Sequence, residues 1–163
     1  MKTLFIAGNE GAGKTPVSNN LEKLLNENYR IYQRRIPNPA GHEEDFIKIF
    51  EGTTKDKRDI RIVLSSASDS QEVIDNMIEK LKLAFDGKRH TNIVLITTAR
   101  NTGDPSRKYL EKKIAEVCPD NEIIEFPLAR INEKAEDSVH EWYHKSVDSI
   151  LEHILSKEPF NLF

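Results

Sequence analysis

The sequence predicts an α/β fold in which about five mainly parallel strands form a sheet with helices on both faces. Two observations lead to this prediction. Short apolar runs alternate with segments whose apolar residues recur at helical spacing along the chain of 163 residues. In addition, the first apolar run leads through a glycine-rich octet directly into a helical pattern. Such alternation is typical of strands joined by crossover helices, and it predicts a ligand at the carboxyl ends of the strands.

Most of the expected strands are short runs of apolar residues bounded by polar or turn-forming residues. The strands are expected at residues 3–7, 29–36, 60–66, 93–98 and 122–128. Between the second and third strands lies a polar stretch that contains Phe46, Ile47 and Phe50. These three residues would share one side of a helix, so a short helix is expected there.

The helices are predicted by apolar stripes and by signals at their ends. The first follows the octet and ends near residue 28, and the clearest stripe covers residues 73–85 and stops at Gly87. Asp104 and Pro105 open the next helix as its cap and its first-turn proline. The last helix is expected over residues 136–155.

Length and composition indicate one domain over residues 1–163. A formal net charge of -3 with 31% charged residues gives no indication of nucleic acid or an anionic membrane as a partner. Cys118 is the single cysteine, so no disulfide can form within the chain, which fits a reducing cytoplasm. No apolar run approaches the roughly 18 residues of a membrane span, and no signal-peptide layout is visible. We therefore expect a cytoplasmic protein.

The best clue to function is an octet that reads Gly-Asn-Glu-Gly-Ala-Gly-Lys-Thr and matches the Walker A pattern G-x-x-x-x-G-K-[ST]. Its glycines let the backbone wrap a phosphate, and the following helix start adds partial positive charge. Lys14 would reach the terminal phosphates, and the Thr15 hydroxyl would ligate Mg²⁺. The predicted nucleotide-binding residues are Gly8, Asn9, Glu10, Gly11, Ala12, Gly13, Lys14 and Thr15.

On these residues the chain resembles the P-loop NTPase superfamily, and its layout resembles the small nucleotide and metabolite kinase branch. The resemblance implies a three-layer P-loop fold with strand order 2-3-1-4-5, and it implies ATP or GTP with Mg²⁺ as the cofactors. The leading hypothesis is a kinase that transfers the γ-phosphoryl group to a small-molecule acceptor. One alternative is a nucleotide-dependent switch or slow NTPase that acts through a protein partner. Another is a degenerate loop that binds only phosphate-like anions.

The resemblance also implies further groups around the phosphates. The family places a carboxylate directly after a strand to hold Mg²⁺, and here the first carboxylate after the third strand is Asp69. Asp69 is therefore the candidate for supporting the metal, with capping of the next helix as the alternative. Arg100 and Arg107 follow the fourth strand, where kinases of this class carry lid arginines. The predicted catalytic set is Lys14, Asp69, Arg100 and Arg107, and an ordinary solvated loop is the alternative for the arginines.

Pro16 departs from the family pattern, because proline lacks the backbone N–H that would reach the α-phosphate. Its fixed φ suits the first helical turn, so the helix itself should form normally. The missing contact is charge-assisted, and its loss is worth roughly 1.5 to 3 kcal/mol of triphosphate binding. We therefore expect weakened binding relative to a loop with that donor.

The segment after the second strand would border the acceptor in a kinase. Arg34 or Arg35 could hold an anionic substrate there, and Glu43, Glu44 or Asp45 could serve as a base. The alternative is that the acidic residues only favour the start of a helix through its dipole.

The last predicted helix contains His-Glu-Trp-Tyr-His at residues 140–144, which matches the zinc-protease pattern H-E-x-x-H. Two histidines four residues apart can ligate one Zn²⁺, but a catalytic site needs a third protein ligand. No convincing third ligand follows in the 19 residues after His144. A surface or packing role is therefore the favoured interpretation.

Overall fold

The computed structural model describes residues 1–37, 45–85, 92–132 and 134–163, and the side chains of residues 34–37 lie outside that description. Within these ranges the chain forms six strands and four helices. In chain order they are β1 (Lys2–Ala7), α1 (Lys14–Asn28), β2 (Arg30–Pro37), β3 (Phe46–Thr53), β4 (Asp59–Ser65), α2 (Gln71–Phe85), β5 (Asn92–Ala99), α3 (Pro105–Val117), β6 (Glu122–Pro127) and α4 (Asp137–Leu155).

The strands form one sheet in the order β2-β3-β4-β5-β1-β6. β1 is parallel to its neighbours β5 and β6, and β4 is parallel to β5. β3 is antiparallel to both β2 and β4. The expected α/β class is confirmed, but the expected strand count and the order 2-3-1-4-5 are wrong. β1 lies between β5 and β6, which are the expected fourth and fifth strands. The order was predicted wrongly because long-range pairing decides which strands are neighbours, and local apolar patterns do not encode that pairing.

β3 replaces the short helix that we expected around Phe46, Ile47 and Phe50. The spacing of those residues fits a helix, but residues 46–50 are all buried. A run that is buried on every side chain is typical of a strand inside a sheet with both faces covered. β3 meets this condition because it pairs with β2 on one side and with β4 on the other.

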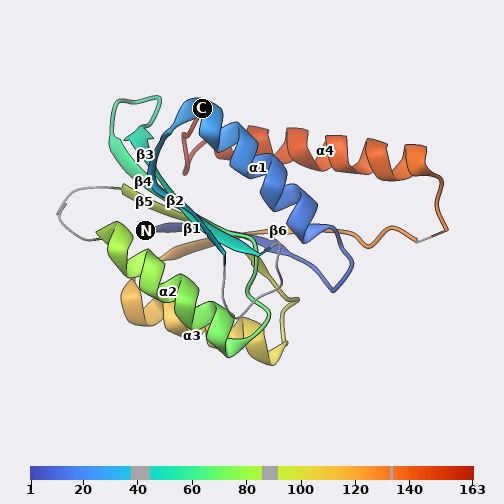
Figure 1. Cartoon of the computed structure of the whole chain (residues 1–163), viewed down its shortest axis with the longest axis horizontal. Helices are drawn as coiled ribbons and strands as arrows, with labels where there is room; N and C mark the ends of the chain where they lie inside the picture. Colours follow the sequence, from blue (N-terminus) through green and yellow to red (C-terminus); the bar gives the residue numbers. More distant parts are fainter. Residues whose placement is uncertain (38–44, 86–91, 133) are drawn as a thin grey trace.

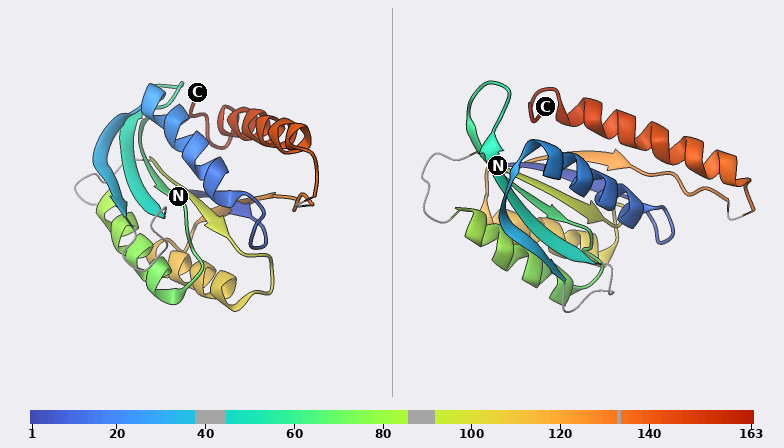
Figure 2. Two further views of the ribbon diagram at one scale, coloured as in Figure 1. Left: turned by 45° about the vertical axis from the view of Figure 1, so that its right-hand side comes forward. Right: turned by 45° about the horizontal axis from the view of Figure 1, so that its top comes forward.

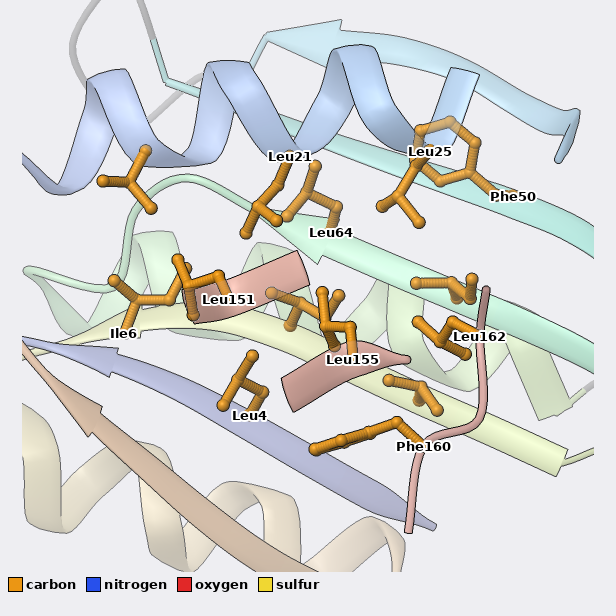
Figure 3. Packing of buried hydrophobic residues seen from close by; sticks show 14 of the residues in the cluster. Leu4, Ile6, Leu21, Leu25, Phe50, Leu64, Leu151, Leu155, Phe160 and Leu162 are labelled. Carbon is orange, nitrogen blue, oxygen red and sulfur yellow. The ribbon is translucent and has the colours of Figure 1, made fainter. Parts of the chain in front are cut away.

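Helices cover both faces of the sheet, as expected. Figures 1 and 2 show α1 and α4 on one face and α2 and α3 on the opposite face. Alternate residues of β1 serve the two cores: Leu4 and Ile6 pack under α1 and α4, whereas Phe5 packs under α2 and α3. Phe160 and Leu162 return beneath α4 and complete the first core (Figure 3). This packing fixes α1 and α4 on the face of the sheet that carries Leu4 and Ile6.

The carboxyl ends of β1, β4 and β5, three of the four parallel strands, meet at one edge of the sheet. β3 runs in the opposite direction, so its first residues lie at the same edge: Ile47 pairs with Ser65, the last residue of β4. Four loops or strand ends therefore converge where a ligand is expected in an open α/β sheet.

Candidate functional site

The glycine-rich loop, residues 8–13, places the start of α1 at this edge. Gly11 and Gly13 have φ angles of 73° and 82°, in the left-handed region that glycine adopts without steric cost. Gly13 is the N-cap of α1, and among the described residues no side chain caps this end and no acid lies in the first turn. The partial positive charge of the helix start therefore faces an open loop, which is the arrangement that binds anions in proteins.

The side chain of Lys14 folds back over the glycine-rich loop. Its Nζ donates hydrogen bonds to the carbonyl oxygens of Gly8 at 2.9 Å and of Asn9 at 2.8 Å. Burial lowers the pKa of Lys14, and the nearby negative charge of Asp69 opposes that shift. These contacts hold the ammonium group at the loop, where a phosphate could replace the two carbonyl partners.

A cavity of about 350 Å³ opens in front of this loop, and we call it the loop cavity. Its walls come from the glycine-rich loop and the first residues of α1, and from the ends of β3, β4 and β5. It is lined by residues 10–16 together with Asp45, Ser66, Asp69 and Arg100. The structure thus brings together predicted site residues from three distant segments of the sequence: Lys14 and Thr15, Asp69, and Arg100. Gly8 and Asn9 do not line the cavity, but their carbonyl groups hold Lys14.

An ion pair joins two of these residues. Nε of Arg100 lies 3.1 Å from Oδ1 of Asp69, and its Nη1 lies 3.9 Å from the exposed carboxylate of Glu10. Asn101, the next residue, donates a hydrogen bond of 2.8 Å to the side-chain oxygen of Asn9. Side-chain contacts therefore join the loop after β5 to the loops after β1 and β4.

Asp69 does not take the capping role that we considered as the alternative. α2 begins at Gln71, and the side chain of Ser70 accepts the hydrogen bond from the backbone N–H of Val73 at 3.3 Å. The carboxylate of Asp69 instead lines the loop cavity and contacts Arg100. It is therefore available for ligand chemistry, and its role as a metal ligand stays a prediction.

Arg107 is placed differently from Arg100, because it is not among the residues that line the loop cavity. Its side chain is only 6% exposed, and its guanidinium group lies 4.2 Å from the centre of the Phe5 ring. Nε contacts Glu111 at 2.6 Å, and Nη2 contacts Glu125 at 2.8 Å. The guanidinium group therefore lies between α3 and the sheet, where its contacts stabilise the fold.

Asp45 is the one candidate base that the structure describes. It precedes β3, is buried, and lines the loop cavity. Glu43 and Glu44 lie outside the described residues, as do the side chains of Arg34 and Arg35. Because β3 is antiparallel to β4, its first residues bring Asp45 to this edge of the sheet. The sequence did not predict this placement, since a helix was expected in this segment.

A second, smaller hollow of about 90 Å³ lies on the other side of the glycine-rich loop. It is lined by residues 11–13, by residues 129–131 after β6, and by His140, Tyr143 and His144 of α4. The backbone N–H of Ala129 donates to the hydroxyl of Tyr143 at 2.7 Å. Both histidines of the H-E-x-x-H pattern therefore line a hollow that the glycine-rich loop also lines, which was not foreseen from the sequence.

The zinc interpretation of that pattern gains nothing from the structure. Within the part of the chain that the structure describes, no group of three or more His, Cys, Asp or Glu side chains could hold a metal ion. A Mg²⁺ ion at Thr15 and Asp69 would use a hydroxyl, a carboxylate, water and phosphate oxygens, so it does not need such a group.

Comparison of the chain with protein-family models, with curated proteins and with solved structures gives no match. Among the described residues, no helix combines the length and the apolar character needed to cross a membrane. The geometry of the loop cavity therefore carries the functional argument.

Proposed function

We propose that the protein binds a nucleoside triphosphate, ATP or GTP, with Mg²⁺ in the loop cavity and acts as a small-molecule or nucleotide kinase. One observation carries the proposal: Lys14, Thr15, Asp69 and Arg100 converge on a cavity in front of a glycine-rich helix start. ATP is the default, because the sequence has no guanine-recognition signature.

The mixture of charges in the cavity supports a metal-bound polyphosphate as its ligand. Lys14, Arg100 and the start of α1 favour an anion, whereas the carboxylates of Asp45 and Asp69 would repel a bare one. A divalent cation resolves this conflict, since it binds both carboxylates and phosphate oxygens. In this proposal Thr15 and Asp69 hold the Mg²⁺ that arrives with the nucleotide.

The remaining residues have roles in phosphoryl transfer. Lys14 neutralises the β- and γ-phosphates, and Arg100 stabilises the charge on the transferring group. The bond from the γ-phosphorus to the β-phosphate oxygen breaks while a bond to an acceptor hydroxyl oxygen forms. Asp45, which lines the same cavity, accepts the hydroxyl proton, and the nucleoside diphosphate leaves.

A nucleotide-dependent switch is the second candidate, and the contacts between loops favour it. The glycine-rich loop is joined to the loop after β5 through Asn9 and Asn101 and through Glu10 and Arg100. A nucleotide that draws Arg100 to its phosphates would break the second contact and shift that loop. Pro16 also favours slow chemistry, because it removes one phosphate donor.

The test combines binding with turnover. Calorimetric titration with ATP and MgCl₂ should show one site per chain, and Lys14→Ala should weaken binding by at least about 100-fold, the loss expected for a charge-assisted contact to two phosphates. ADP release should then be followed with and without a panel of small hydroxyl-bearing and anionic acceptors. Turnover that requires an acceptor supports a kinase, and slow acceptor-independent hydrolysis supports the switch. No ATP binding by the natural chain would leave only an anion-binding loop.

A further inference from the structure

The glycine-rich loop is in contact with α4 as well as with the sheet. The imidazole of His144 lies against Gly13, the residue at which α1 begins. A Cβ atom built on Gly13 would be only 2.8 Å from Cε1 of His144, closer than side chains approach in real structures. Gly13 therefore has two separate reasons to be glycine: its left-handed φ of 82° and the imidazole edge beside it.

The position of His144 is set by its surroundings on α4. The preceding residue, Tyr143, is held by the backbone N–H of Ala129. One turn further on, the carboxylate of Asp148 accepts a hydrogen bond of 2.7 Å from Asn20 of α1. Nδ1 of His144 is buried and has no hydrogen-bond partner among the described residues. Burial of a polar nitrogen without a partner is unfavourable, so packing against the loop, and not hydrogen bonding of Nδ1, explains where the imidazole lies.

We propose that His144 is a positioning residue that couples occupation of the glycine-rich loop to α4. The inference rests on the proposed nucleotide binding. Phosphates would draw the loop N–H groups into one geometry, and Gly13 cannot shift toward α4 without meeting the imidazole. A ligand that restrains the loop thus restrains α4, and by linkage a well-placed α4 lowers the ordering cost of binding. Loss of the imidazole should weaken ATP binding about ten-fold, within the usual range of coupling between sites.

The experiment measures both ends of this coupling in the full chain. Calorimetry gives the affinity for ATP with MgCl₂, and hydrogen exchange by mass spectrometry gives the protection of α4 with and without saturating ATP. In the natural chain ATP should slow exchange in α4. His144→Ala should bind ATP about ten-fold more weakly, and at saturation its α4 should exchange as fast as without ATP. The more conservative His144→Gln, which keeps a side chain of similar reach, should recover most of the affinity.

Two matched variants separate this role from general loosening of α4. Asn20→Ala removes the contact with Asp148 and weakens the docking of α4, but it leaves the contact between His144 and Gly13 intact. ATP should still protect α4 in that variant. His153 is an exposed histidine of the same helix, so His153→Gln should behave as the natural chain does.

Trp142 provides a second readout if His144→Ala is too unstable for exchange measurements. It is the single tryptophan of the chain, it lies on α4 and it is 67% exposed, so its fluorescence anisotropy reports on this helix. ATP should raise the anisotropy in the natural chain and in His144→Gln. Equal affinity of His144→Ala and the natural chain, or continued protection of α4 in His144→Ala, would overturn the inference and leave nucleotide binding intact. Absence of ATP binding by the natural chain would overturn both.

Discussion

Arg107 and Arg100 lie seven residues apart in the same polar region of the sequence, yet we expect their substitution to affect different properties. Substitution of Arg107 should lower the stability of the fold, and substitution of Arg100 should lower the affinity for ATP. Arg107→Ala should destabilise the fold and leave ATP affinity within about two-fold, provided that binding is measured where the variant is folded. The reason is its position: the guanidinium group is buried on Phe5 and contacts Glu111 and Glu125, and the side chain does not reach the loop cavity.

The size of the effect follows from these contacts. A desolvated cation over an aromatic ring contributes about 1 to 2 kcal/mol. Each ion pair contributes about 0.5 to 1 kcal/mol, because the partners Glu111 and Glu125 are 43% and 35% exposed and solvent screens them. We therefore expect a loss of about 3 kcal/mol in the free energy of unfolding. In a chain of 163 residues this corresponds to a fall in Tm of roughly 6 to 12 °C.

Urea and thermal unfolding followed by circular dichroism measure the stability, and calorimetry measures ATP binding. Arg100→Ala is the matched comparison, because Arg100 lines the cavity. It should change Tm by less than about 2 °C, as its ion pairs are partly exposed, but it should weaken ATP binding about ten-fold or more. The reasoning is refuted if Arg107→Ala keeps the natural Tm, or if Arg107→Ala loses ATP binding while Arg100→Ala retains it.

Three further predictions concern the loop and the core. Lys14→Met should abolish measurable ATP binding in calorimetry, because it removes the cation at the loop, and it should change Tm little, because the hydrogen bonds of Nζ among the described residues go to two loop carbonyls; a large fall in Tm would show that the lysine is structural. Pro16→Ser restores a backbone N–H and should tighten ATP binding by roughly ten-fold or more, and unchanged affinity in calorimetry would contradict the proposed α-phosphate contact. Burial raises the pKa of Tyr29 to about 12, so the unfolded chain, with an ordinary tyrosine pKa of about 10, ionises first and stability is lost as pH rises from about 10 to 12. Urea unfolding across this range should show a shallower decline in Tyr29→Phe, and an identical decline would contradict the assignment.

Local patterns were enough to predict most of the helices and strands. The cap formed by Asp104 and the first-turn Pro105 are present, since Asp104 accepts a hydrogen bond from the N–H of Ser106. Such signals act over a few residues, so a single sequence contains them. The segment at β3 was predicted wrongly, because burial on both faces, which depends on β2, β4 and the covering helices, outweighed the local spacing.

The sequence by itself determined which residues form the glycine-rich loop, because that motif is contiguous: strand, loop and helix follow one another, and Gly11 and Gly13 take the φ angles that only glycine adopts easily. The tertiary structure alone decided what surrounds the loop. Sheet pairing brings Asp45 to the cavity edge, and the packing of α4 brings His144 to Gly13. These neighbours come from segments far apart in the chain, and long-range pairing and packing place them together without leaving a signal in the local sequence.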